Sequence, residues 1–259
     1  AMTDAVFATY PSLDGMPVVV SGGATGIGEF IVREFAAQGA KVGFVDIAAE
    51  AGRKLEAELN GNGSTVRFTE CDIRDVPAYQ SAIAGFGKAH GDALALVNNA
   101  AHDLRHDWDK VTPELWDNLT AVNLRHAFFA AQAVLPGMIA ARRGSIINFG
   151  SISWMIMVPN LTAYTASKAA MHGMSRSLAK EVGQHGVRVN TLVPGWVMTE
   201  RQLAELIGPE ENKLIDSTQA LAGRVYPVDV ARMALFLAAD DSKMLSGQDF
   251  VVDGGWAHG

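Results

Sequence analysis

The sequence is poor in the features that mark secreted, membrane-spanning and nucleic-acid-binding proteins. One cysteine, Cys71, among 259 residues cannot form an internal disulfide, so we expect a reducing cytoplasm. The 21 basic residues are outnumbered by 28 acidic ones, and a formal charge of −7 argues against a nucleic-acid or anionic-membrane partner. The chain also lacks the run of about 18 apolar residues that a membrane span needs. Thr3–Gly15 lacks the pattern of a signal peptide.

The chain also lacks the metal-binding motif of zinc proteases. His102, Asp103, His106 and His126 could suggest a metal site, but HExxH does not occur in the chain. We therefore expect chemistry without a metal ion.

The composition is that of a folded domain with a large core. Hydrophobic residues make up 49% and charged residues 19%, which excludes a disordered chain. Residues 1–259 suffice for a single α/β domain, since doubly wound folds often reach this length undivided. Ala1 before Met2 is interpreted as the remnant of an expression tag.

Short β-branched runs alternate with helical patterns from Met16 onward. This alternation is typical of βαβ units and predicts a doubly wound, seven-stranded parallel sheet with helices on both faces. The predicted strands are Val18–Val20, Lys41–Asp46, Val66–Thr69, Leu94–Asn98, Ser145–Phe149, Arg188–Val193 and Phe250–Val252. The predicted helices are Ile27–Gln38, Ala48–Leu59, Val76–His90, Pro113–Arg142 with a break, Tyr164–His185 and Val228–Ala239.

A glycine-rich turn, Ser21–Gly28, joins the first predicted strand to the first helix. Glycines there let the backbone approach a pyrophosphate, whose charge the helix N-terminus can bind. Asp46 ends the second strand, where a carboxylate can bind the adenosine ribose and repel a 2′-phosphate. Neither Lys41 nor Arg53 lies immediately beside Asp46, so the sequence favours NAD over NADP.

Two further residues have two readings each. Asp72 follows the third strand, and it either reaches the adenine or caps the next helix. Asn123 lies in an apolar helical stretch, and its buried amide either holds the backbone or belongs to a proton relay.

Ser151, Tyr164 and Lys168 form the candidate catalytic group. Tyr164 and Lys168 are four residues apart on a predicted helix, so the ammonium could lower the pKa of the phenol. Ser151 follows the fifth strand and could hydrogen-bond the same reacting oxygen.

These patterns together resemble the short-chain dehydrogenase/reductase superfamily over essentially the whole chain. The matching motifs are Ser21–Gly28, Asn98–Ala100, Asn123, Ser151, Tyr164 with Lys168, and Pro194–Gly195; the chain departs from the family at Ala101, where glycine is usual. The resemblance implies a Rossmann-type fold, a catalytic tetrad of Asn123, Ser151, Tyr164 and Lys168, and a homotetramer. The predicted NAD contacts are Gly22, Ala24, Thr25, Gly26, Ile27, Gly28, Asp46, Asp72, Ile73, Asn99, Ala100, Ala101, Tyr164, Lys168, Pro194, Gly195, Val197 and Thr199.

The strings YPSLDG, VNLRH, NFGSISW and PGWVMTERQ are similar to those of bacterial aldose 1-dehydrogenases that act on pentoses or 6-deoxyhexoses. This resemblance implies oxidation of a sugar at C1 to the aldonolactone. Substrate contacts are expected from loops after strands four to six, because ligands bind at the carboxyl ends of parallel strands. The predicted contacts are His102, Asp103, Ser151, Ser153, Trp154, Tyr164, Trp196 and Arg201.

Several alternatives stay open at this point. Trp154, Met155, Ile156 and Met157 could instead pack under their loop or at a subunit contact, and we favour this reading for the methionines. Residues 195–226 form either a lid over sugar and nicotinamide or a rigid excursion. The enzyme could act on another polar alcohol or ketone such as a deoxy-sugar acid. A non-catalytic dinucleotide-binding regulator is disfavoured, because Tyr164 and Lys168 are both present.

Overall fold

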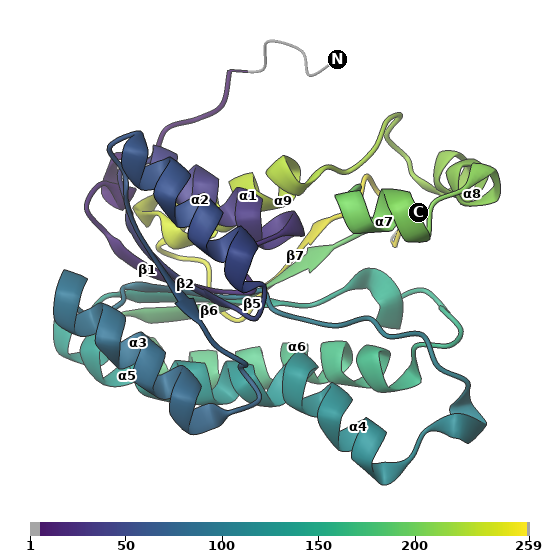
Figure 1. The fold of residues 1–259 in the computed structure, drawn as a ribbon, viewed down its shortest axis with the longest axis horizontal. Helices are drawn as coiled ribbons and strands as arrows, with labels where there is room; N and C mark the ends of the chain where they lie inside the picture. Colours follow the sequence, from purple (N-terminus) through teal and green to yellow (C-terminus); the bar gives the residue numbers. More distant parts are fainter. Residues whose placement is uncertain (1–5, 258–259) are drawn as a thin grey trace.

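Seven parallel strands form one sheet in the order β3-β2-β1-β4-β5-β6-β7 in the computed structural model (Figure 1). The structure describes residues 6–257, so Ala1 and Met2 lie outside the described part. The strands are β1 (Pro17–Ser21), β2 (Lys41–Asp46), β3 (Thr65–Glu70), β4 (Ala95–Asn98), β5 (Gly144–Phe149), β6 (Val187–Pro194) and β7 (Asp249–Val252). Each predicted strand is present with its ends shifted by at most one residue, so the predicted fold class is confirmed.

Helices cover both faces of this sheet. Figure 1 shows one layer containing α1 (Gly26–Ala37), α2 (Ala49–Gly61) and α9 (Pro227–Ala238). The opposite layer contains α3 (Val76–His90), α4 (Pro113–Thr120), α5 (His126–Ala141) and α6 (Thr162–Val182). Successive residues of β1 belong to opposite cores, since Val18 and Val20 pack in one and Val19 in the other. This alternation explains why the strand is apolar throughout.

The site is positioned by the point at which the strand order reverses. β1 pairs with β2 on one side and with β4 on the other. The connections leaving β1 and β4 therefore diverge to opposite faces and open a crevice at the carboxyl edge of the sheet. Ligands bind in this crevice in open α/β sheets.

The predicted helical break between Pro113 and Arg142 is a π-helical turn, Ala121–Arg125, which joins α4 to α5. Asn123 lies in this turn and is fully buried. Such turns are rare, and they often occur at functional sites.

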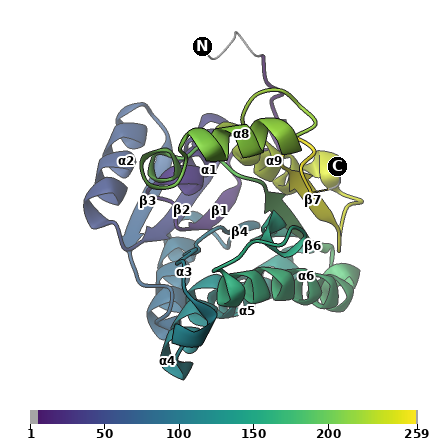
Figure 2. The ribbon, with the colours of Figure 1, turned by 90° about the vertical axis from the view of Figure 1, so that its right-hand side faces the viewer.

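The segment after β6 leaves the sheet and returns to it. It contains two short helices, α7 (Glu200–Glu205) and α8 (Pro209–Thr218), which Figure 1 labels at the right. Figure 2 shows α8 above the strands of the sheet. A bridge between Val197 and Val225 brings the two ends of the segment together. Among the described residues, no helix is both long and apolar enough to cross a membrane.

Candidate active site

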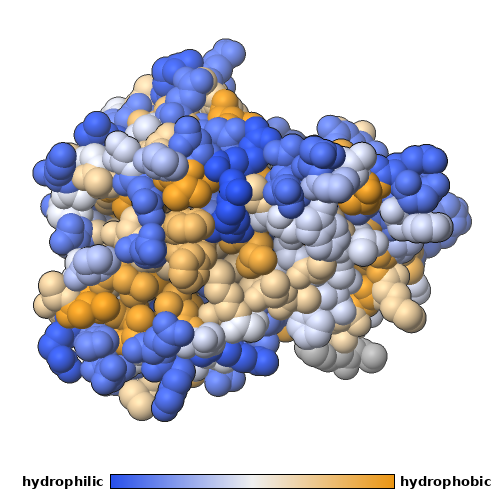
Figure 3. All heavy atoms as spheres, turned by 90° about the horizontal axis from the view of Figure 1, so that it is seen from below, coloured by the Kyte–Doolittle hydropathy of each residue, from blue (hydrophilic) through white to orange (hydrophobic). Residues whose placement is uncertain are grey.

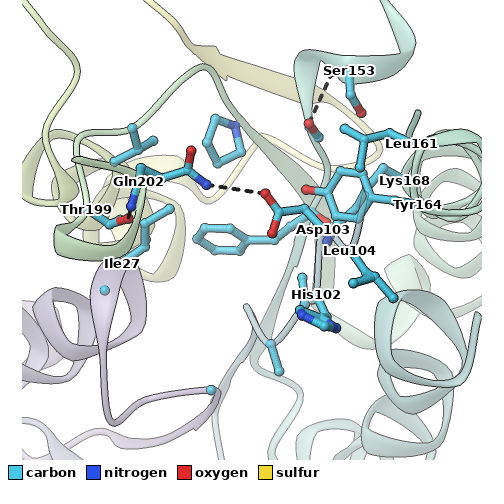
Figure 4. A pocket seen from close by; sticks show the side chains of 18 of the residues that line it. Ile27, His102, Asp103, Leu104, Ser153, Leu161, Tyr164, Lys168, Thr199 and Gln202 are labelled. Atoms are coloured by element: carbon cyan, nitrogen blue, oxygen red, sulfur yellow. Dashed lines mark hydrogen bonds between the residues drawn. The ribbon is translucent and has the colours of Figure 1, made fainter. Parts of the chain in front are cut away.

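A cavity of about 1440 Å³ lies at the carboxyl ends of the strands and collects most of the predicted site residues. Figure 4 shows Tyr164, Lys168 and Ser153 on one side of it, Thr199 and Gln202 on the other, and Asp103 between them. Of the predicted residues, only Ala24, Asn123 and Trp154 do not line its wall. Its volume exceeds that of a typical single-ligand pocket, so it has room for two molecules side by side.

The glycine-rich turn makes one end of the cavity narrow enough for backbone contact with a ligand. Gly22 and Gly26 adopt left-handed conformations, with φ of 67° and 58°. A Cβ on Gly28 would lie 1.7 Å from the carbonyl oxygen of Gly22, so no side chain fits there. Asn99 Nδ2 donates to the same oxygen at 2.9 Å and fixes the turn. None of the described side chains caps the N-terminus of α1, which favours a pyrophosphate at that end.

Asp46 holds the turn against the end of β2. Its Oδ2 accepts from the backbone N–H of Ala24 at 3.0 Å, and its Oδ1 accepts from that of Ala48 at 2.9 Å. Ala24 is thus buried behind the turn and does not line the cavity, which corrects its predicted role as a cofactor contact. The two backbone bonds keep the carboxylate oriented at the cavity wall.

The cations near this end are already paired. Arg53 lies 3.3 Å from Glu70, and Arg74 lies 2.6 Å from Asp72. The N-cap of α3 is Asp75, whose side chain accepts from Ala78 N–H at 3.0 Å. The capping alternative for Asp72 is therefore wrong, and Asp72 lines the cavity next to Ile73.

The side chain of Asn123 hydrogen-bonds the backbone of the loop that follows β4. Its Oδ1 accepts from His102 N–H at 2.8 Å, and its Nδ2 donates to His102 C=O at 3.0 Å. The amide thus anchors the loop that follows β4, as the structural reading expected. These two bonds use one oxygen lone pair and one N–H of the amide, so the role of Asn123 in a proton relay stays a prediction.

Lys168 connects α6 to the end of β5. Its Nζ donates to the carbonyl oxygen of Phe149 at 2.8 Å and lies 5.6 Å from the centre of the Tyr164 ring. Ser151 follows Phe149 by two residues, and its Oγ accepts from Ser153 N–H at 3.1 Å. The buried amine of Lys168 therefore lies near the Tyr164 ring and at the end of the strand that leads to Ser151.

The pKa values of this group differ from the expectation. Burial is the main influence that raises the pKa of Tyr164 to about 12, although a hydrogen bond with Ser151 acts to lower it. Burial also lowers the pKa of Lys168 to about 7. The expected lowering of the phenol pKa by Lys168 is therefore absent from this arrangement, because burial disfavours the charged form of both groups.

Residues from two separate segments meet at the substrate end. Asp103 accepts from Arg201 in a short hydrogen-bonded ion pair and from Gln202 Nε2 at 3.2 Å. Gln202 Oε1 in turn accepts from Trp196 Nε1 at 2.8 Å. His102, Ser151 and Ser153 line the same end. This part of the cavity presents hydroxyl, carboxylate, amide and indole groups together.

Trp154 points away from the cavity, which corrects its predicted substrate role. Its Nε1 donates to His172 Nε2 at 2.9 Å, and the other ring nitrogen of His172 lies 2.8 Å from Asp249 Oδ1. The indole therefore anchors its loop to α6 and β7. Met157 does not pack under its loop, because it is fully exposed and lines the cavity, and its alternative role at a subunit contact stays a prediction.

Several other residues of the cavity wall could not be predicted as site residues from the sequence. Trp256 lies near the C-terminus, 6.2 Å from Trp196 between ring centres, and it reaches the cavity only through the fold. Some apolar or amide side chains of the wall come from α4 and α8, among them Leu115, Asn118 and Leu214. A tryptophan or leucine after a strand is typical of core packing, so its position alone did not indicate a site.

No metal centre is formed within residues 6–257. His102 and His106 are four residues apart, but no group of three or more metal-binding side chains occurs in the described part of the chain. His126 is buried, and burial, with the charge of Lys168, lowers its pKa to about 3. It is therefore neutral and packs at 6.4 Å from the Tyr79 ring.

The chain is similar to known proteins in sequence and in fold. Residues 22–257 match the family described as Enoyl-(Acyl carrier protein) reductase. The chain belongs to the short-chain dehydrogenase/reductase family. It is 44% identical to a D-xylose 1-dehydrogenase of Caulobacter vibrioides over 96% of this chain and 98% of that protein. It is 40% identical to a probable galactose dehydrogenase of Rhizobium meliloti over 95% and 96%.

A solved family member shows that the fold can hold a nicotinamide dinucleotide. A blue fluorescent protein from a metagenomic library, in complex with NADPH, has a TM-score of 0.88 and 32% identity over 95% of this chain and 99% of that one. This short-chain dehydrogenase/reductase is therefore an oxidoreductase that acts on CH–OH groups with a nicotinamide cofactor. The glycine turn, the α1 N-terminus and Asp46 provide a cradle that fits such a cofactor.

The lowered pKa of Lys168 predicts a pH-dependent stability for the protein without cofactor. Burial moves this pKa from 10.5 in the unfolded chain to about 7. Between those values the unfolded state binds more protons, so the free energy of unfolding should rise with pH by up to about 1.4 kcal/mol per unit. Urea unfolding at about pH 7 and pH 9.5 measures this rise. Lys168→Met should remove it, and an equal rise in both proteins would contradict the burial argument.

Proposed function

We propose that the enzyme oxidises the C1 hydroxyl of an aldose, a pentose or 6-deoxyhexose, to the aldonolactone with NAD. The observation that carries the proposal is the position of Ser151 and Tyr164 beside the polar group formed by Asp103, Arg201 and Gln202. A sugar offers a hydroxyl for each of these groups. The names of the xylose and galactose dehydrogenases support the same substrate class.

In this mechanism Tyr164 removes the proton of the C1 hydroxyl. Ser151 hydrogen-bonds the same oxygen and keeps it within reach of the phenol. To act near neutral pH, Tyr164 needs a pKa below its value of about 12. A protonated Lys168 and the Ser151 hydrogen bond both act in that direction. Bound NAD supplies the hydride acceptor, and Asn123 holds the loop that carries His102 and Asp103.

A panel of aldoses tests this function. Initial rates with NAD would be followed by NADH absorbance for pentoses, 6-deoxyhexoses, hexoses and, as a comparison, a deoxy-sugar acid. Turnover of at least one aldose with accumulation of its lactone supports the proposal. Turnover of the acid alone would favour the alternative, a dehydrogenase for another polar alcohol or ketone.

The Tyr164→Phe variant should retain NAD binding and lose turnover by several orders of magnitude, because the ring still packs while the proton acceptor is gone. The Ser151→Ala variant should lose about a hundredfold, comparable with the loss of one positioned hydrogen bond. Steady-state kinetics and NAD titration check both effects. Near-normal turnover of Tyr164→Phe would contradict the mechanism, and a change below about threefold in Ser151→Ala would leave the serine a structural role.

The enzyme should prefer NAD to NADP by at least about tenfold in kcat/KM, since a phosphate dianion beside Asp46 costs more than about 1.4 kcal/mol. Arg53 and Arg74 are engaged by Glu70 and Asp72, so neither is free to offset that cost. Comparing kcat/KM for the two cofactors measures the preference. Equal values would mean that a cation leaves its partner and reaches the phosphate.

We further propose that residues 195–226 act as a lid. α7 carries Arg201 and Gln202, and their bonds to Asp103 join the excursion to the loop after β4 across the cavity. Hydrogen exchange should show amides of residues 196–220 more protected in the ternary complex with NAD and a good sugar than in the free enzyme. Unchanged exchange would mean a rigid excursion.

The proposed homotetramer uses the helices α5 and α6. Figure 3 views the molecule from the side of these helices and shows apolar residues gathered there. A shallow groove between the two helices is lined mainly by apolar side chains, and Phe128 is 46% exposed. Small residues such as Ala170 permit close approach of a second copy. We also propose that the enzyme is cytoplasmic and has no nucleic-acid or membrane partner.

A further inference from the structure

Asp103 places a carboxylate in the cavity beside the candidate catalytic tyrosine. It lies on the loop after β4, and Figure 4 shows it between Gln202 and Tyr164. Its Oδ1 pairs with Arg201 and its Oδ2 accepts from Gln202 Nε2 at 3.2 Å. Its side chain is only 19% exposed, whereas that of Arg201 is 47% exposed. Asp103 is therefore held in place more firmly than Arg201.

The charge of Asp103 is held in place by these contacts. Burial acts to raise the pKa of Asp103, but the hydrogen bond and charge of Arg201 bring it below its usual value. The carboxylate is therefore ionised at neutral pH. Its charge also reaches the phenol, since Asp103 acts to raise the pKa of Tyr164. A second anion bound close to the reacting oxygen would meet this negative charge.

Asp103 keeps Arg201 from binding another anion. A guanidinium binds carboxylates through parallel N–H donors, so a free Arg201 at the substrate end would suit a sugar acid. In the structure Nη2 of Arg201 is bonded to Asp103, and Nη1 lies 3.8 Å from Glu205, so each terminal nitrogen already faces a carboxylate. The other nearby guanidinium, Arg105, donates to the carbonyl oxygen of Pro159 at 3.3 Å.

We propose that Asp103 is the specificity-determining residue that restricts the substrate to uncharged sugars. Its carboxylate accepts hydrogen bonds from sugar hydroxyls, repels a substrate carboxylate and keeps Arg201 from binding one. Specificity of this kind combines an attractive contact with a repulsive one. The inference rests on the proposed function, since it takes the sugar to bind beside Asp103.

The test compares D-fucose, a 6-deoxyhexose, with D-galacturonate, which differ only in a methyl or carboxylate group at C6. Wild type and Asp103→Asn are assayed with both sugars, and the readout is the ratio of kcat/KM for galacturonate to that for D-fucose. This ratio is insensitive to general damage. Asn keeps the size and one acceptor but removes the charge, so the ratio should rise by at least about tenfold.

Glu205→Gln is the matched control, because it removes the same charge from a second neighbour of Arg201 and leaves Asp103 in place. Its ratio should stay within about threefold of wild type. If Asp103→Asn turns over neither sugar, quenching of tryptophan fluorescence with NAD present gives the two dissociation constants, and the same tenfold criterion applies.

Two results would overturn the inference: a ratio in Asp103→Asn within about threefold of wild type, or a wild type that uses both sugars equally well. Both leave the proposed function intact, because wild type still oxidises D-fucose. Failure of the proposed function has a different signature, since wild type would then oxidise no aldose. In that case the dissociation constants of the two sugars decide the inference without turnover.

Discussion

The hydrogen bond from Lys168 to the carbonyl oxygen of Phe149 is the contact on which the catalytic geometry depends. It joins α6, which carries Tyr164, to the end of β5, which leads directly to Ser151. The bond is buried, and an unpaired amine or carbonyl there would cost about 1–3 kcal/mol. The sheet and the helix are therefore held in one relative position, and the two reacting side chains follow.

This contact also sets an electrostatic condition on the reaction. Burial makes the neutral forms of Tyr164 and Lys168 the stable ones, with pKa values of about 12 and about 7. Proton removal from an alcohol then requires a lower pKa of Tyr164, and a protonated Lys168 would provide it, since a cation close to the phenol stabilises the phenolate. Asp103 and Arg201 lie at the substrate end of the cavity, where their charges affect the same phenol. The charge of a bound substrate and the pKa of Tyr164 would therefore influence each other.

Much of this architecture could be predicted because it is encoded locally. Strand periodicity, the glycine turn and the spacing of Tyr164 and Lys168 are properties of short segments, and each corresponds to the observed structure. What could not be predicted concerns side chains whose partners are far away in sequence. Trp154 turns to His172, and the partner of Asn123, the backbone of His102, could not be named although a structural role for this amide was expected. Neither direction follows from a local pattern, and burial, which reversed the expected pKa of Tyr164, is a property of the whole fold.

The central claim is that this site removes a hydride from C1 of a sugar. The most direct measurement uses the best aldose substrate carrying deuterium at C1, with unlabelled NAD. The account predicts that the reduced cofactor contains one deuterium at C4 of the nicotinamide and that the product is an unlabelled lactone, as mass spectrometry would show. Deuterium retained in the sugar product would place the oxidation at another carbon and contradict the account.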